Sequence, residues 1–105
     1  MARRFYTYIM TNKRHTVLYT GMTNNLRRGL DEHRHPVHRC FTKRYNVTTL
    51  VYFEVFASPS AAIRREKQIK AGPRRKKVEL IENTNPVWAD LTDQIPLWSG
   101  DASLA

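Results

Sequence analysis

Several features that stabilise or anchor small proteins are missing from this sequence. Cys40 is the single cysteine among 105 residues, so no disulfide can form within the chain, and a reducing compartment is indicated. No apolar run approaches the roughly 20 residues of a membrane-spanning helix. The first residues include Arg3 and Arg4, but no apolar segment with a cleavage site follows them. These absences exclude a disulfide scaffold and a membrane span, and they predict a cytoplasmic protein that does not bind membranes.

Acidic residues are scarce over most of the chain. Residues 3–77 contain all 18 lysines and arginines but only four acids, a net charge of +14, whereas residues 78–105 have five acids and no lysine or arginine. A domain this basic repels itself, and binding to a polyanion, most often nucleic acid, relieves that repulsion. Solubility alone is the alternative explanation.

The length and the hydrophobic pattern predict one small α+β domain. Strands are expected over residues 5–11, 16–22 and 48–56 because these segments are rich in aromatic and β-branched residues. A helix that ends near Arg34 is expected after an N-cap at Thr23 or Asn24. Two further helices are expected over 59–71 and 74–83. Ser58-Pro59 is typical of a helix start, and Gly72-Pro73 of a stop.

The resulting order is β-β-α-β-α-α, which predicts a three-stranded antiparallel or mixed sheet flanked by helices. We expect the domain to cover residues 1–92 and a C-terminal tail to cover residues 93–105.

Glu66 is the most informative single residue. Helical spacing places it between Ala62, Ile63 and Ile69, in the middle of an apolar stripe. A buried carboxylate needs a charged partner or a metal. Glu66 is therefore either a metal ligand or catalytic acid, or a core-edge carboxylate that is satisfied by Arg65 or another neighbour.

Tyrosines occupy matching places in the first two predicted strands. Tyr6 and Tyr8 share a face of the first strand, and Tyr19 precedes Gly21 near the end of the second. Glycine at that position permits the close approach of a ligand. Such tyrosines can serve a phosphate site, or they can simply be good strand formers with a polar tip.

Two further groups of residues suggest ligands. His33, His35, His38 and Cys40 could bind zinc, but they fall within eight residues and lack a second, separated pair. The basic runs are candidate phosphate contacts, although each could also be a solvated face: Lys43-Arg44, Arg64-Arg65, Lys70 and Arg74-Arg75-Lys76-Lys77.

Taken in order, a set of short motifs resembles the GIY-YIG nuclease domain, and specifically its small bacterial stand-alone members of the UPF0213 type. The resemblance covers about residues 4–92, and the following motifs carry it: Tyr6-Thr7-Tyr8, Tyr19-Thr20-Gly21, Asn25-Leu26 with His33, Phe41 to Tyr45, Arg65 to Lys70, and Asn85-Pro86-Val87-Trp88.

This resemblance implies metal-dependent hydrolysis of phosphodiester bonds, with DNA as the expected partner. Glu66 would hold one divalent cation, Mg²⁺ or Mn²⁺. Tyr8 and Tyr19 would position or deprotonate the attacking water, and His33 would shuttle a proton. Asn85 matches a supporting asparagine of the family.

One departure from the family pattern concerns a catalytic arginine. The family places it one helical turn before the histidine, where this chain has Gly29, and the neighbouring Arg28 points about 100° away around the helix. Without a cation for the transition state, cleavage can slow by orders of magnitude. Either Arg28 takes the role, or the protein cleaves weakly, or it is a non-catalytic nucleic-acid-binding module. A further hypothesis, built on the cluster of His33, His35, His38 and Cys40, is a zinc-stabilised interaction domain.

The charge pattern predicts that affinity for duplex or branched DNA falls steeply as the salt concentration rises, because lysine and arginine side chains displace counterions from the phosphates when the protein binds. Reversing the charges of residues 74–77 should weaken binding similarly for all DNA sequences. Fluorescence anisotropy across a salt series measures both effects, and binding that does not depend on salt would contradict the polyanion interpretation.

Overall fold

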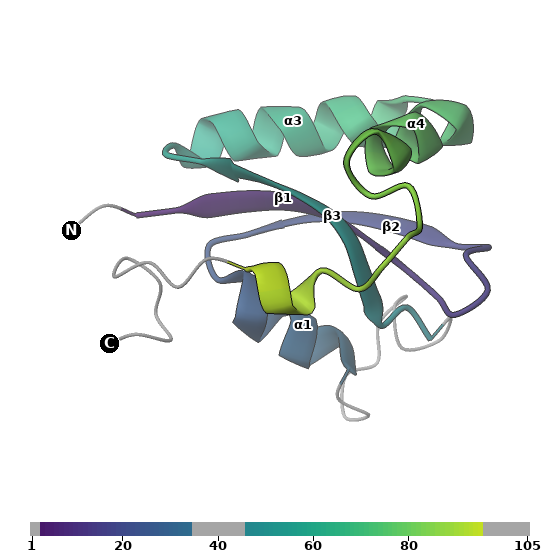
Figure 1. The fold of residues 1–105 in the computed structure, drawn as a ribbon. Coiled ribbons are helices and arrows are strands. Elements are labelled where there is room, and N and C mark those ends of the chain that lie inside the picture. Colours follow the sequence, from purple (N-terminus) through teal and green to yellow (C-terminus); the bar gives the residue numbers. More distant parts are fainter. Residues whose placement is uncertain (1–2, 35–45, 96–105) are drawn as a thin grey trace.

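The computed structural model describes residues 3–34 and 46–95, and it confirms the predicted α+β fold. Three antiparallel strands form a sheet in the order β2-β1-β3. In Figure 1, α3 and α4 lie on one face of this sheet and α1 lies on the other. The elements are β1 (Phe5–Thr11), β2 (Leu18–Thr23), α1 (Leu26–Arg34), β3 (Thr49–Phe56), α3 (Pro59–Ala71), α4 (Arg74–Thr84) and a 3₁₀ turn, η1 (Thr92–Gln94).

The turn between β1 and β2 is longer than the predicted strand boundaries imply. Asn12 Oδ1 accepts hydrogen bonds from the backbone N–H of Thr16 at 2.8 Å and of Val17 at 3.1 Å. This side chain takes the place of a strand partner for the two residues. The second strand therefore begins at Leu18, and the prediction that it begins at Thr16 was wrong.

The first helix is capped by a different residue from those predicted. Asn25 Oδ1 accepts the backbone N–H of Arg28 at 3.1 Å, and the Asn25 carbonyl oxygen accepts that of Gly29 at 2.9 Å. Asn25 is therefore the N-cap, in place of Thr23 or Asn24. Thr23 Oγ1 instead accepts the N–H of Asn25 at 3.1 Å and so orients the cap.

A β-bulge interrupts the third strand. Ile9 pairs with Tyr52, but the next residue of β1, Met10, pairs with Leu50, so Val51 is an extra residue. The sequence pattern predicts Leu50 and Tyr52 on one face. The bulge places Leu50 in the core beside α1 and Tyr52 in the core beside α3 and α4.

Each face of the sheet has its own hydrophobic core. Tyr6, Tyr8 and Met10 of β1 pack with Leu26 and Leu30 of α1. On the other face, Ile9 packs with residues of β3, α3 and α4, namely Val51, Tyr52, Ile69 and Ile81. The alternation of side chains along β1 thus supplies both layers.

Helix α3 begins and ends as the sequence predicts. Ser58 Oγ accepts the N–H of Ala61 at 3.3 Å, Pro59 is the first helical residue, and Gly72 follows the last. The helix is attached to β1 by a buried hydrogen bond of 2.7 Å from Thr7 Oγ1 to the carbonyl oxygen of Ala62.

A polar triad connects α3 to β3. The Tyr52 hydroxyl and Arg65 Nε both donate to Glu54 Oε2, the second over 2.9 Å. Burial of Tyr52 and its hydrogen bond to Glu54 raise the pKa of Tyr52 to about 12. The triad therefore turns Arg65 toward β3 and limits the rotation of α3 about its axis.

The segment after α4 crosses to the α1 face of the sheet (Figure 1). Its Leu91 N–H donates to the carbonyl oxygen of Leu50 at 2.8 Å, and Ile95 is 4% exposed within the core beside α1. Ile95 lies inside the predicted tail of residues 93–105, so the packed part of the chain extends beyond residue 92. Within residues 3–34 and 46–95, no helix has the length and apolar character needed to cross a membrane.

The triad predicts a loss of stability at high pH. The pKa of Tyr52 is higher in the folded protein than its ordinary value near 10. The protonated Tyr52 hydroxyl therefore contributes fully to folding stability below pH 10, and this contribution is lost as the pH rises toward about 12. The Tm of Tyr52→Phe should therefore fall less than the Tm of the wild-type chain as the pH is raised from about 9 to about 12. Parallel Tm curves for the two proteins would show that Tyr52 does not titrate in this way.

Candidate active site

Tyr8 and Tyr19 form a packed pair beside Gly21. Tyr8, on the central strand β1, is 4% exposed, and its ring centroid lies 6.4 Å from that of Tyr19 on β2. Gly21 lies directly opposite Tyr8 in the strand pairing. A Cβ at Gly21 would lie 2.6 Å from the Tyr8 hydroxyl oxygen and 2.7 Å from its Cζ. Glycine is therefore required here for the phenol of Tyr8 to lie across the neighbouring strand.

Glu66 is half-buried on α3, where its side chain is 20% exposed. Ala62 and Ile69 are buried, but Ile63 is 38% exposed. Glu66 thus lies at the border of the buried stripe, and the prediction that it lies in the middle was wrong. Its Oε2 is 3.0 Å from Lys70 Nζ, whereas Arg65 pairs with Glu54.

Helix geometry shows which way Glu66 faces. Relative to the buried Ala62, Arg65 lies about 60° to one side and Glu66 about 40° to the other. Because Arg65 reaches Glu54 on β3, Glu66 faces the opposite way, toward β2. Helix α3 contacts β2 as well as β1, so this is the side on which it covers the edge strand.

The tyrosine pair and Glu66 belong to opposite faces of the sheet. Thr7 bonds to α3, so the next residue, Tyr8, faces α1. The two groups share the edge strand β2, since Tyr19 is part of it and Glu66 faces it. A ligand that touches both must therefore approach along β2, whose outer side has no strand partner within the described residues.

The predicted helix residues have different environments. Arg28 is exposed, and its Nη2 donates to Asn24 Oδ1 at 2.6 Å. A Cβ at Gly29 would lie 3.6 Å from Thr23 Cγ2, an ordinary contact, so the position is open to alanine. The side chain of His33 lies outside what the structure describes, as do His35, His38, Cys40, Lys43 and Arg44.

Glu66 is the predicted metal ligand. No group of three or more histidine, cysteine or acidic side chains that could hold a metal ion occurs in the described part of the chain. Zinc sites need such a group, but Mg²⁺ keeps several waters and needs only one or two protein carboxylates. A half-buried carboxylate at a strand edge fits the second type of ion.

Several predicted phosphate-binding cations contact other parts of the chain. Arg74 donates to the carbonyl oxygens of His15 at 2.7 Å and Thr16 at 3.1 Å, so it attaches α4 to the hairpin. Arg65 and Lys70 are in the ion pairs described above, and Lys76 Nζ lies 3.8 Å from Glu79 Oε1. Arg75 and Lys77 follow Arg74 in the first turns of α4.

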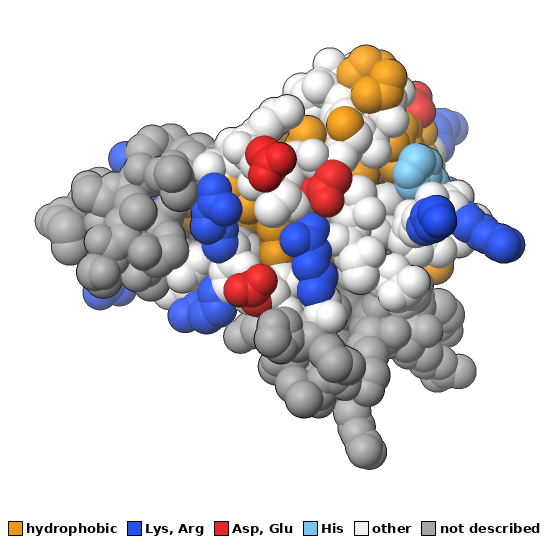
Figure 2. Space-filling model, turned by 60° about the horizontal axis from the view of Figure 1, so that its bottom comes forward, with side chains coloured by type: hydrophobic (Ala, Val, Ile, Leu, Met, Phe, Trp, Pro, Cys, Tyr) orange, Lys and Arg blue, Asp and Glu red, His pale blue; other side chains and the backbone are white. Residues whose placement is uncertain are grey.

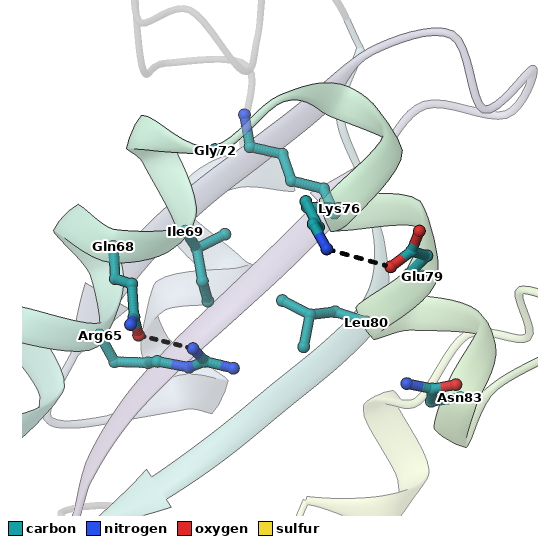
Figure 3. Close-up of a pocket in the computed structure, with 9 residues that line it drawn as sticks. Arg65, Gln68, Ile69, Gly72, Lys76, Glu79, Leu80 and Asn83 are labelled. Atoms are coloured by element: carbon teal, nitrogen blue, oxygen red, sulfur yellow. Dashed lines mark hydrogen bonds and ion pairs between the residues drawn. The ribbon is translucent and has the colours of Figure 1, made fainter.

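A pocket of about 390 Å³ separates α3 from α4. Figure 3 shows Ile69 and Leu80 pointing into it, with the Arg65–Gln68 hydrogen bond on one side and the Lys76–Glu79 ion pair on the other. Lys77 and Asn83 also line it. The pocket thus lies on the face of the sheet away from Tyr8, and its rim is mainly basic.

The face that carries α1 is mixed in charge. Figure 2 shows basic and acidic side chains interspersed over its described part. Arg34 forms an ion pair of 3.4 Å with Asp90, and Arg27 donates to the carbonyl oxygen of Ile95 at 3.2 Å. These arginines therefore hold the segment after α4 against the domain.

Asn85 is a buried structural residue. Its Nδ2 donates to the carbonyl oxygens of Val51 at 3.1 Å and Ala89 at 2.8 Å, and its Oδ1 accepts the Ala89 N–H at 2.9 Å. These bonds hold the turn after α4 against β3.

Sequence reasoning missed the roles of Tyr52 and Glu54. The sequence contained a signal for this contact, because Tyr52 and Glu54 share one face of a predicted strand and Arg65 lies on a helix expected to cover the sheet. Their connection depends on how α3 is placed over β3, which local patterns do not determine.

Comparisons with known proteins agree with the fold. A family model described as the GIY-YIG catalytic domain matches residues 4–79. A UPF0213 protein of Staphylococcus haemolyticus is 38% identical over 79 residues, which cover 75% of this chain and 95% of that protein. A UPF0213 protein of Clostridium perfringens is 37% identical over 78 residues, which cover 74% of this chain and 83% of that protein. The solution NMR structure of a UPF0213 protein from Bacillus halodurans matches with a TM-score of 0.54 and 26% identity, covering 90% of this chain and 99% of that one.

Two glycine substitutions should have opposite effects on stability. Gly21→Ala places a methyl group 2.6 Å from the Tyr8 hydroxyl oxygen and should lower the free energy of unfolding by about 1–3 kcal/mol. Gly29→Ala, whose nearest contact is 3.6 Å, should raise it by up to about 1 kcal/mol. Urea denaturation measures both values. A neutral Gly21→Ala would show that the tyrosine is not held against this glycine.

Proposed function

The chain belongs to the GIY-YIG family, whose catalytic domain is of nuclease type, and on that premise we propose that it is a metal-dependent endonuclease that hydrolyses DNA phosphodiester bonds. DNA processing or repair is the setting that suits this activity.

The proposal rests on the phenols of Tyr8 and Tyr19 and the Glu66 carboxylate flanking one edge strand, β2, from its two faces. Tyr8 is held across Gly21 and packs against Tyr19, and Glu66 faces the same strand from α3. Rigid phenols can orient an attacking water and contact a phosphate oxygen without first having to be ordered. A scissile phosphate placed along β2 would lie between these phenols and the carboxylate.

Glu66 is the residue that would hold a divalent cation, Mg²⁺ or Mn²⁺. Such an ion supplies Lewis-acid stabilisation of charge on a phosphoryl oxygen. Glu66 is suited to this role because it is half-buried, and its present partner, Lys70, is a cation whose side chain is 53% exposed. Exchanging one cation for another leaves the charge of the carboxylate compensated.

Arg28 is the candidate for further positive charge. It is exposed, and its Nη2 donates to Asn24, so the other N–H groups of the guanidinium could contact a substrate. His33 remains the candidate proton shuttle on the same helix.

Arg75 and Lys77, which form no ion pair within the described part of the chain, would guide the DNA. Arg75 and Lys77 belong to α4, and Lys77 lines the pocket between α3 and α4. Phosphate contacts of this kind set position without reading the sequence.

A second candidate function is nucleic-acid binding without cleavage. Two observations favour it: Gly29 occupies the place of the family's arginine, and Lys70 occupies the Glu66 carboxylate. The fold and the basic residues would be retained, but the transition state would lack a cation.

Glu66→Gln should reduce Mg²⁺- or Mn²⁺-dependent nicking of a supercoiled plasmid by at least about 100-fold, because the amide is a poor ligand for a hard cation. The matched control is Glu79→Gln, which also removes a helical glutamate from a lysine ion pair and should leave the rate within about twofold. Both variants should melt near the wild-type Tm.

Cleavage by Glu66→Gln at the wild-type rate would contradict the role of Glu66. Absence of cleavage by the wild-type protein, together with salt-dependent DNA binding, would favour the binding module.

A further inference from the structure

Thr20 carries a buried hydroxyl without a hydrogen-bond partner among the described residues. Thr20 is 4% exposed, and its Oγ1 is buried. The buried threonines of β1 differ, since Thr7 Oγ1 donates to Ala62 and Thr11 Oγ1 to Val17, each over 2.7 Å. A buried hydroxyl that makes no hydrogen bond lowers stability, and such a group in a native protein calls for an explanation.

The Thr20 side chain points toward α3. Tyr19 packs on the α1 side, and a Cβ on Gly21 would meet the rings of Tyr8 and Tyr19 on that same side. Side chains alternate along a strand, so Thr20 faces the opposite side. Leu18, two residues earlier, packs in the core beside α3 and α4, which agrees with this direction.

Thr20 also lies at the level of Glu66 along α3. The Thr7–Ala62 hydrogen bond aligns the helix with β1, and Ile69 packs with Ile9 further along both elements. Glu66 is one turn beyond Ala62, about 6 Å. Ile9 is two residues beyond Thr7, about 6.6 Å.

Ile9 pairs directly with Thr20. Since Glu66 faces the β2 side of α3, its carboxylate and the Thr20 hydroxyl occupy the same stretch of the interface between α3 and β2.

We propose that Thr20 is a positioning residue for Glu66. Its hydroxyl donates a hydrogen bond to the Glu66 carboxylate when that carboxylate leaves Lys70 to hold a divalent cation. This inference rests on the proposed function, because it requires Glu66 to bind the cation.

Two physical arguments support this role. A divalent cation at Glu66 repels the Lys70 ammonium, so the oxygen that Lys70 now contacts loses its partner. Carboxylates that bind metals are in turn held by hydrogen bonds, and losing such a bond weakens metal affinity about 10- to 100-fold. The Thr20 hydroxyl is a donor on the strand beneath this carboxylate.

The test compares Thr20→Val, which keeps the shape but removes the hydroxyl, with Thr20→Ser, which keeps the hydroxyl. Without divalent cations, Thr20→Val should raise the Tm, by about 4 °C or more, since the unpartnered hydroxyl is gone. Titration with MnCl₂ in a calorimeter should show binding weakened about tenfold by Thr20→Val and less than about threefold by Thr20→Ser. Glu66→Gln is the reference for a lost site.

The outcomes separate the two proposals. If Thr20→Val binds Mn²⁺ as tightly as the wild-type chain while Glu66→Gln does not bind it, the role of Thr20 is overturned and the Glu66 site stands. If Thr20→Val lowers the Tm in the absence of cations, the hydroxyl has a structural partner and the proposal is also overturned. If neither the wild-type chain nor Glu66→Gln binds Mn²⁺, the metal site fails and the role of Thr20 fails with it.

Discussion

The orientation of α3 over the sheet depends on two contacts, one for its position and one for its rotation. The hydrogen bond from Thr7 to Ala62 places the helix along β1, and the ion pair of Arg65 with Glu54 turns one flank toward β3. Together they direct the other flank, which carries Glu66, toward the edge strand. The two side chains are partly exposed, at 28% for Arg65 and 26% for Glu54, and an exposed ion pair contributes little to stability. Its importance is geometric, because a modest rotation of α3 would move Glu66 either into the core or into solvent.

The edge strand β2 is flanked by candidate site residues from both layers of the molecule. Gly21 gives the Tyr8 phenol room to lie across β2, and Tyr19 packs against that phenol on the same side. On the other side of the strand, Thr20 faces α3. Tyr19, Thr20 and Gly21 thus face alternately the α1 side, where the phenols lie, and the α3 side, which carries Glu66.

Much of the fold could be predicted because its signals are local. Ser58-Pro59 and Gly72-Pro73 define α3, and the β-branched and aromatic runs define the strands. The errors arose where one side chain changed the local pattern. The Asn12 side chain accepts hydrogen bonds from the N–H groups of Thr16 and Val17, so β2 begins later than predicted. The bulge at Val51 places Leu50 and Tyr52 on opposite faces of the sheet.

The candidate site was predictable as a set of residues but not as an arrangement. Motif order identified Tyr8, Tyr19, Gly21 and Glu66. Their distribution over two faces follows from how α1 and α3 pack, and the choice of Lys70 as the partner of Glu66 follows from Arg65 being held by Glu54. These are long-range choices that no window of sequence contains.

Under the proposed function, Glu66 and the tyrosine pair serve one site at the edge of β2. Paramagnetic broadening in ¹H–¹⁵N NMR spectra tests it directly, because a small amount of Mn²⁺ broadens the amide signals nearest to its binding site. We predict that the amides of Tyr19, Thr20, Gly21 and Glu66 broaden first in the wild-type protein and that this broadening disappears in Glu66→Gln. Broadening centred on Glu79 and Glu82 of α4, with the β2 amides unchanged, would contradict the account.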